Sequence, residues 1–126
     1  MKNDMIVKKC AKCGAMVLTF KDCSCKECGI KCCFEEMKIL EPNSVEASFE
    51  KHLPSYKVVG DKIIAEVGHV MEEEHYIEWI VYVSDNKQDI RYFDAGMNAV
   101  AEFDYEKGGK LYSYCNKHGL WMKEVE

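Results

Sequence analysis

Seven of the eight cysteines of this 126-residue chain lie between residues 10 and 33. A segment of about forty residues is too short to bury a sufficient hydrophobic core, so it usually needs a metal ion or a covalent crosslink to fold. The first residues lead into no apolar run typical of a signal peptide, and we therefore expect a cytoplasmic protein. In a reducing compartment, clustered cysteines favour metal binding over disulfide bonds.

The composition is that of a folded domain, with 48% apolar and 31% charged residues. The formal net charge of -5 argues against nucleic acid as a partner, and an anionic substrate would have to be attracted by local positive charge. No stretch approaches the roughly 20 apolar residues of a membrane-spanning helix, so no membrane partner is expected.

The cysteine-rich segment is predicted to end at a linker, Glu41–Ser44, where a proline and an asparagine interrupt regular structure. The cysteines stop at this point, and the pattern changes to that of strands. Residues 1–41 are therefore predicted to form a small metal-binding module, and residues 42–126 a second domain.

The second domain is predicted to be all-β. Residues 55–59 and 62–67 flank Gly60–Asp61, a short turn that favours a β-hairpin. Residues 76–83 alternate apolar side chains on one face and are partly apolar on the other, which is typical of a central strand. Further short strands are predicted at residues 90–93, 98–103 and 110–114. Their regular spacing and the absence of useful helical periodicity favour a β-sandwich or barrel.

A second candidate metal site combines the four histidines with the one cysteine outside the cluster: His52, His69, His75, Cys115 and His118. On an extended strand His69 and His75 would lie about 20 Å apart, at about 3.3 Å per residue, so a shared ion requires the chain to loop back. Gly68 and the acidic residues 72–74 are typical of such a loop. A turn after the cysteine would likewise let it bind the same ion as His118.

The types of donor atom limit the choice of metal. Imidazole nitrogens with a thiolate favour iron, copper or zinc over magnesium or calcium. Five protein ligands exceed the three that a catalytic zinc ion usually takes. Five ligands on an octahedral iron ion leave one position open for a small molecule that accepts an electron. The pattern therefore indicates redox chemistry rather than hydrolysis.

Three segments, Glu50–Pro54, His69–Trp79 and Cys115–Trp121, resemble in this order the ligand segments of the superoxide reductases, the desulfoferrodoxin and neelaredoxin family. The resemblance implies an immunoglobulin-like β-sandwich. It also implies a catalytic non-haem iron with four equatorial imidazoles and one axial thiolate: His52, His69, His75, His118 and Cys115. The implied reaction is the one-electron reduction of superoxide to hydrogen peroxide, as a defence against oxidative stress.

The same resemblance implies roles for two neighbouring residues. Lys51 would hold positive charge near the open position and attract superoxide. Glu50 would occupy the sixth position once the iron is ferric. The family further implies a rubredoxin-like protein as the electron donor and a homodimer as the assembly.

At the front of the chain, Cys10-x2-Cys13 and the adjacent pair Cys32 and Cys33 resemble the desulforedoxin-like module of desulfoferrodoxins, in which four thiolates hold a rubredoxin-like iron. Four thiolates suit iron and zinc about equally, so this four-cysteine site is predicted to hold iron or zinc. Phe34 stands where the family usually has a glycine. Three extra cysteines lie between the two pairs: Cys23, Cys25 and Cys28.

The extra cysteines leave a rival arrangement open. In it, Cys10 and Cys13 would join Cys25 and Cys28 in a zinc-ribbon site. Two rival functions are also open: a non-catalytic iron electron-transfer protein, and a zinc-ribbon interaction module, which predicts a colourless protein. Both leave the four histidines and Cys115 without a role, so the sequence favours the enzyme.

Overall fold

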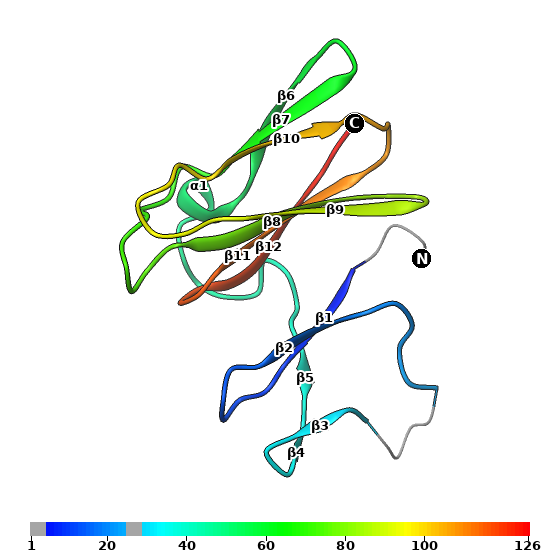
Figure 1. The fold of residues 1–126 in the computed structure, drawn as a ribbon, viewed down its shortest axis with the longest axis vertical. Helices are drawn as coiled ribbons and strands as arrows, with labels where there is room; N and C mark the ends of the chain where they lie inside the picture. Colours follow the sequence, from blue (N-terminus) through cyan, green and yellow to red (C-terminus); the bar gives the residue numbers. More distant parts are fainter. Residues whose placement is uncertain (1–4, 25–28) are drawn as a thin grey trace. The chain divides into compact units, whose positions relative to one another are not determined.

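The structure, a computed structural model, describes residues 5–24 and 29–126. The chain divides into two compact units, Met5–Glu41 and Pro42–Glu126 (Figure 1). Nearly all of the regular structure in both units is antiparallel β-sheet. Among the described residues, no helix is long and apolar enough to cross a membrane.

The larger unit is a sandwich of two antiparallel sheets. The first sheet has the strand order β10 (Val100–Asp104), β7 (Lys62–Glu66), β6 (Ser55–Val59). The second has the order β12 (Gly119–Glu124), β11 (Lys110–Cys115), β8 (Ile77–Ser84), β9 (Lys87–Tyr92). A single helical turn, α1 (Phe49–His52), precedes β6. The predicted all-β, immunoglobulin-like sandwich is therefore confirmed.

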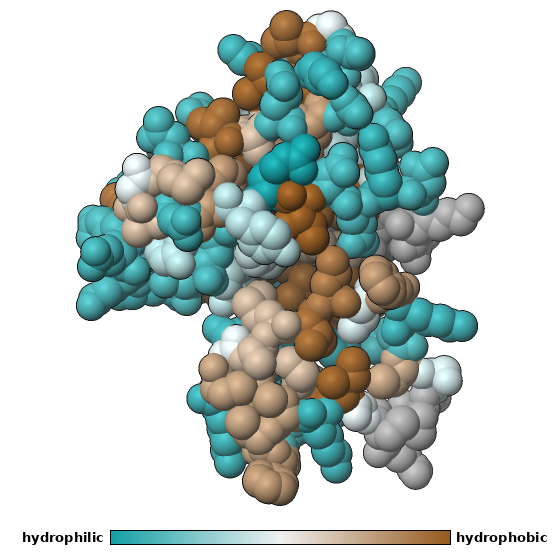
Figure 2. All heavy atoms as spheres, in the orientation of Figure 1, coloured by the Kyte–Doolittle hydropathy of each residue, from teal (hydrophilic) through white to brown (hydrophobic). Residues whose placement is uncertain are grey.

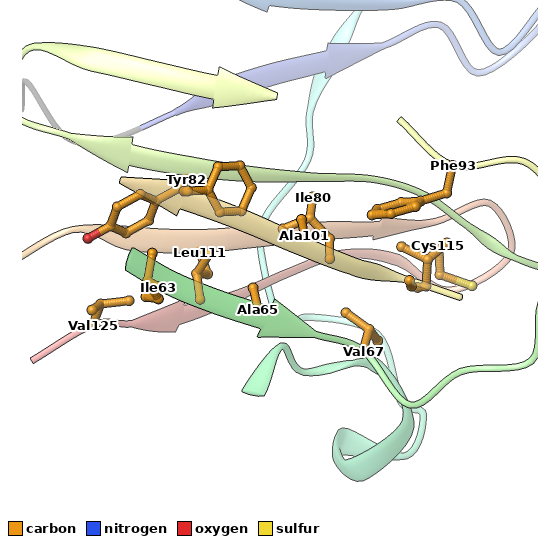
Figure 3. Packing of buried hydrophobic residues seen from close by; sticks show 13 residues of the cluster. Ile63, Ala65, Val67, Ile80, Tyr82, Phe93, Ala101, Leu111, Cys115 and Val125 are labelled. Atoms are coloured by element: carbon orange, nitrogen blue, oxygen red, sulfur yellow. The ribbon is translucent and has the colours of Figure 1, made fainter. Parts of the chain in front are cut away.

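The core of the larger unit lies between the two sheets (Figure 3). Ile63 and Ala65 of β7 face Ile80 of β8 and Leu111 of β11, and all four side chains are fully buried. Each large aliphatic side chain buried in this way contributes about 1.5–3 kcal/mol. Cys115 belongs to the same cluster and is also fully buried, so the candidate metal ligand is positioned by the packed end of the core.

Two elements of the larger unit were not predicted. The hairpin of β6 and β7 is confirmed, with Gly60 at φ +62° in its turn. However, the helix α1 has only four residues, too few to give a helical pattern. The strand β12 was missed because Leu120 and Trp121 are adjacent apolar residues, both buried, and such a pair breaks the expected alternation.

The segment predicted as a linker is anchored to the sandwich at Asn43. The backbone N–H of Asn43 donates to the carbonyl of Leu120 at 2.9 Å. The side chain of Asn43 accepts from the N–H of Met122 at 2.9 Å and donates to the carbonyl of Met122 at 3.2 Å. Asn43 adopts φ +60°, a left-handed conformation that asparagine tolerates better than most residues. The chain therefore enters the larger unit along the outer edge of β12.

The smaller unit is the cysteine-rich module. Its main sheet has the order β2 (Met16–Thr19), β1 (Ile6–Lys9), β5 (Lys38–Ile39), and a separate hairpin joins β3 (Lys31–Cys32) to β4 (Glu35–Glu36). Its buried apolar residues are few: Met5, Val7, Cys10 and Met37. In Figure 2 apolar side chains spread over much of the surface of this unit, and Phe20 and Phe34 are fully exposed. Such a small core is consistent with a fold that depends on a metal.

Candidate metal centres

The structure brings together all five histidine and cysteine side chains of the larger unit. One donor atom from each lies within 4.8 Å of the others. His52 comes from the end of α1, and His69 and His75 come from the loop between β7 and β8. Cys115 and His118 come from the end of β11 and the turn that follows it. Three segments far apart in the sequence thus converge at one end of the sandwich.

The loop between His69 and His75 folds back as the sequence predicts. Glu72 and His75 exchange two backbone hydrogen bonds, of 3.0 and 3.1 Å, around a tight turn at Glu73 and Glu74. This turn reverses the chain before β8 begins, and the two imidazole rings lie edge to face, with centroids 4.6 Å apart.

Cys115 faces the core because it lies on the same face of β11 as the buried Leu111. The neighbouring strand β8 is irregular opposite it, and this irregularity turns the buried Ile77 toward the core. Tyr114 pairs with Trp79, but Cys115 pairs with Ile77, so Glu78 is an extra residue in β8. Bulges of this kind redirect side chains and are frequent near functional sites. The Cys115 sulfur lies 3.4 Å from His69 Nε2 and 3.7 Å from His118 Nδ1.

His52 is held by three neighbours. Its Nδ1 donates to the carbonyl of Ser48 at 2.7 Å, which leaves the lone pair of Nε2 facing the cluster. Its ring stacks on Trp121 at 5.0 Å between centroids and 22° between planes. Trp121 Nε1 in turn donates to the carbonyl of His118 at 3.1 Å, and Ser113 Oγ donates to the carbonyl of His52 at 2.9 Å. A hydrogen bond from the ring nitrogen that does not bind the metal, as from His52 Nδ1 to Ser48, orients a histidine ligand before any metal binds.

The donor atoms fit a shared metal ion. Two nitrogens about 2.1 Å from one ion and at right angles to each other lie about 3.0 Å apart. His52 Nε2 and His118 Nδ1 are 3.0 Å apart. His75 Nε2 is buried and has no hydrogen-bond partner in the described part of the chain, which is costly for a polar atom unless a metal takes its lone pair.

The protonation states also suit a metal. Burial is the main cause that lowers the pKa of three of the rings: His52, His69 and His75. The charge of Lys51 lowers the pKa of His52 and His69 further, and Lys117 has the same effect on the pKa of His75. These rings are therefore neutral near pH 7, the state in which imidazole binds a metal.

A pH dependence follows for the metal-free protein. Since the pKa of these rings lies below the ordinary 6.5, the unfolded chain takes up more protons than the folded one as the pH falls through that value. The larger unit should lose thermal stability between about pH 7 and about pH 5.5. The carboxylates whose pKa is lowered, Asp22 and Asp104, titrate below 3.8, outside this range. A melting temperature that stays constant across this range would contradict the account.

The structure places Glu50 and Lys51 on α1, directly before His52. Both side chains are exposed. The carboxylate of Glu50 is not among the clustered donor atoms. The roles expected for these two residues stay predictions.

The second donor group is made by four cysteines of the smaller unit, Cys10, Cys13, Cys32 and Cys33, whose sulfur atoms lie within 4.8 Å of one another. The sulfur of Cys32 is 3.6 Å from that of Cys13 and 3.9 Å from that of Cys33. Four sulfurs at about 2.3 Å from a tetrahedral ion lie about 3.8 Å apart, so the spacing fits iron or zinc.

The turn between the first two cysteines is closed by backbone hydrogen bonds. The backbone N–H of Cys13 points at the Cys10 sulfur at 3.5 Å, and Gly14, at φ +79°, donates to the carbonyl of Cys10 at 3.0 Å. The N–H of Cys13 is the main cause that lowers the pKa of Cys10 to about 7. Cys10 is therefore partly a thiolate at neutral pH, ready to bind a metal.

Phe34 occupies the second position of the turn between β3 and β4. Cys33 and Phe34 have φ +53° and +65°, the pair of left-handed conformations that a type I′ hairpin turn requires. Glycine adopts this conformation without strain, which explains the glycine expected there. Cys23 is exposed and outside the four-cysteine group, and Cys25 and Cys28 lie outside the described residues, so the zinc-ribbon alternative is not tested.

Comparison with known proteins identifies the family. The family model for desulfoferrodoxin matches residues 44–124, which include the whole histidine and cysteine site. The chain belongs to the desulfoferrodoxin family. Desulfoferrodoxins bind iron at two sites, and the structure has one donor group for each.

The desulfoferrodoxin relationship extends to the cysteine-rich unit. A desulfoferrodoxin from Syntrophotalea carbinolica is 35% identical over 128 aligned residues, covering 98% of this chain and 99% of its own. A superoxide reductase from Pyrococcus abyssi is 35% identical over 100 residues, covering 61% of this chain and 87% of its own. The structure of a superoxide reductase from Treponema pallidum has the same fold, with a TM-score of 0.73 over 95% of this chain and 98% of its own at 21% identity.

Proposed function

We propose that this desulfoferrodoxin is a superoxide reductase. The reaction consumes one superoxide, one electron and two protons and yields one hydrogen peroxide. The convergence of four imidazoles and one buried thiolate carries the proposal, because five protein donors leave one octahedral position for a small molecule. When bound there, iron would supply the electron by passing from the ferrous to the ferric state.

The protein residues would contribute charge and geometry. The four imidazoles are neutral donors, whereas the thiolate of Cys115 is the one anionic donor of the group. Because Cys115 is fully buried in the apolar core, water does not compete for its charge. This favours donation of electron density to the metal, which makes the transfer of an electron to superoxide easier.

Lys51 would attract the substrate. The chain carries a formal net charge of -5, which repels an anion at long range, so a local cation is needed. Lys51 directly precedes His52 on α1, is exposed, and its charge reaches two of the imidazole rings. Glu50, beside it, would serve as the sixth ligand once the site is oxidised.

The substitution Lys51→Ala is expected to slow the reaction with superoxide by up to about 10-fold at low ionic strength, the lower end of the range for electrostatic steering. The difference should shrink toward 1 M salt, where the screening length is about 3 Å. Lys107→Ala is the matched control, because Lys107 is exposed and far from the site. It precedes the start of β11, and this strand extends roughly 17 Å from Lys110 to Cys115. Equal salt dependence in the two variants would contradict a role for Lys51.

The proposed function is tested by mixing the reduced protein with superoxide in a stopped-flow instrument. In a superoxide reductase, superoxide oxidises the histidine-bound iron, and superoxide disappears faster than it does without protein. An electron-transfer protein or a zinc-ribbon module leaves superoxide to decay at its spontaneous rate. The rubredoxin-like donor and the homodimer stay predictions from the resemblance.

A further inference from the structure

Asn116 joins the two loops that carry four of the five candidate ligands. Its side-chain Oδ1 accepts from the backbone N–H of Tyr76 at 3.1 Å, and its Nδ2 donates to the carbonyl of Glu74 at 3.0 Å. Its own backbone N–H donates to the carbonyl of Tyr76 at 3.3 Å. We call these three hydrogen bonds the Asn116 bridge.

The Asn116 bridge lies next to two of the candidate ligands. Asn116 directly follows Cys115, and its two partners flank His75 on either side in the sequence. The turn at Glu73 and Glu74 is otherwise closed by the two backbone hydrogen bonds between Glu72 and His75, which lie within the loop itself. The bridge therefore ties the backbone on both sides of His75 to the backbone beside Cys115.

The bridge would also keep the site in its metal-binding arrangement before a metal is bound. His75 Nε2 is buried without a hydrogen-bond partner among the described residues, so no hydrogen bond to this nitrogen holds the ring when no metal is bound. His52, in contrast, is held by Ser48, Trp121 and Ser113. Asn116 does for the ring of His75 what these contacts do for His52, although it touches the backbone rather than the ring.

We propose that Asn116 is a positioning residue that keeps His75 in place for metal binding through the Asn116 bridge. The inference rests on the metal site of the proposed function but not on the reaction with superoxide. A ligand that is fixed before the metal arrives loses less conformational freedom on binding, so the metal is held more tightly. Loss of outer contacts to metal ligands typically reduces metal affinity about 10- to 100-fold.

Two measurements test the proposal in the full-length protein. The first is the rate at which a chelator removes iron from the histidine site, followed by the visible absorption of the iron bound to Cys115. The second is hydrogen exchange of the Tyr76 amide in metal-free protein. For Asn116→Ala we expect iron release about 10- to 100-fold faster and loss of protection at Tyr76. Asn116→Asp, which keeps the acceptor for the Tyr76 N–H, should retain that protection and release iron at an intermediate rate.

Asn86→Ala is the matched control, because Asn86 is exposed in the turn between β8 and β9. It should change neither measurement. Wild-type iron release in Asn116→Ala would overturn the proposal, and so would faster release with unchanged protection at Tyr76. If instead the wild-type histidine site binds no iron, the proposed function fails, while hydrogen exchange at Tyr76 still tests the bridge.

Discussion

Replacing Cys115 by serine is expected to abolish the reduction of superoxide while the sandwich stays folded. Cys115 is fully buried, and its sulfur lies 3.4 Å from His69 Nε2, so serine would place a neutral hydroxyl where a thiolate is needed. Loss of an outer contact alone costs about 10- to 100-fold, and loss of the only anionic donor should cost more than about 100-fold in rate. Stopped-flow measurement of superoxide consumption by the reduced variant checks this.

Cys23→Ser provides the matched control for Cys115. Cys23 is exposed and belongs to neither donor group. Its substitution should leave the rate with superoxide unchanged. Full activity of Cys115→Ser, with iron still bound, would show that the thiolate is not the electron donor to the metal that we propose.

The double substitution of Cys32 and Cys33 by serine is expected to remove the second metal and to unfold the smaller unit. The few buried apolar residues of this unit cannot stabilise it alone. Four-thiolate structural sites contribute on the order of 10 kcal/mol to folding when the metal is bound. Metal analysis of anaerobically purified protein should fall from two irons per chain to one.

Hydrogen exchange of backbone amides shows which unit loses its structure. Amides of β1 should lose protection in the double variant, whereas amides of β8 and β11 should keep it, because the core between the two sheets belongs to the other unit. One iron in both proteins, with or without zinc, would keep the histidine site but show that the four-cysteine site does not hold iron. Retained protection of β1 would contradict the dependence of the smaller unit on metal.

Much of the site follows from the sequence because its ligands lie in short segments with recognisable turns. The loop back at Glu72–His75 and the turn after Cys115 are dictated by local turn chemistry and are found in the structure. Gly119, at φ +82°, closes the second turn in a conformation that favours glycine. The four-cysteine group likewise contains both predicted pairs.

Other features depend on contacts between distant segments, which local patterns do not reveal. The extra residue Glu78 in β8 is visible only from the pairing with β11, yet it turns Ile77 toward the core opposite Cys115. Asn43 resembles a linker residue but binds the edge of β12, and that strand was itself missed. The sequence predicts a turn after Cys115, but not that Asn116 in this turn bonds to Glu74 and Tyr76 on another loop.

The most direct test of the central claim is the product balance of the reaction. Chemically reduced protein would be mixed with a known amount of superoxide under anaerobic conditions, and hydrogen peroxide and dioxygen would be measured together. The account predicts one hydrogen peroxide for each superoxide consumed and no dioxygen. Release of dioxygen in an amount equal to the peroxide would show dismutation instead, and would contradict the assignment as a reductase.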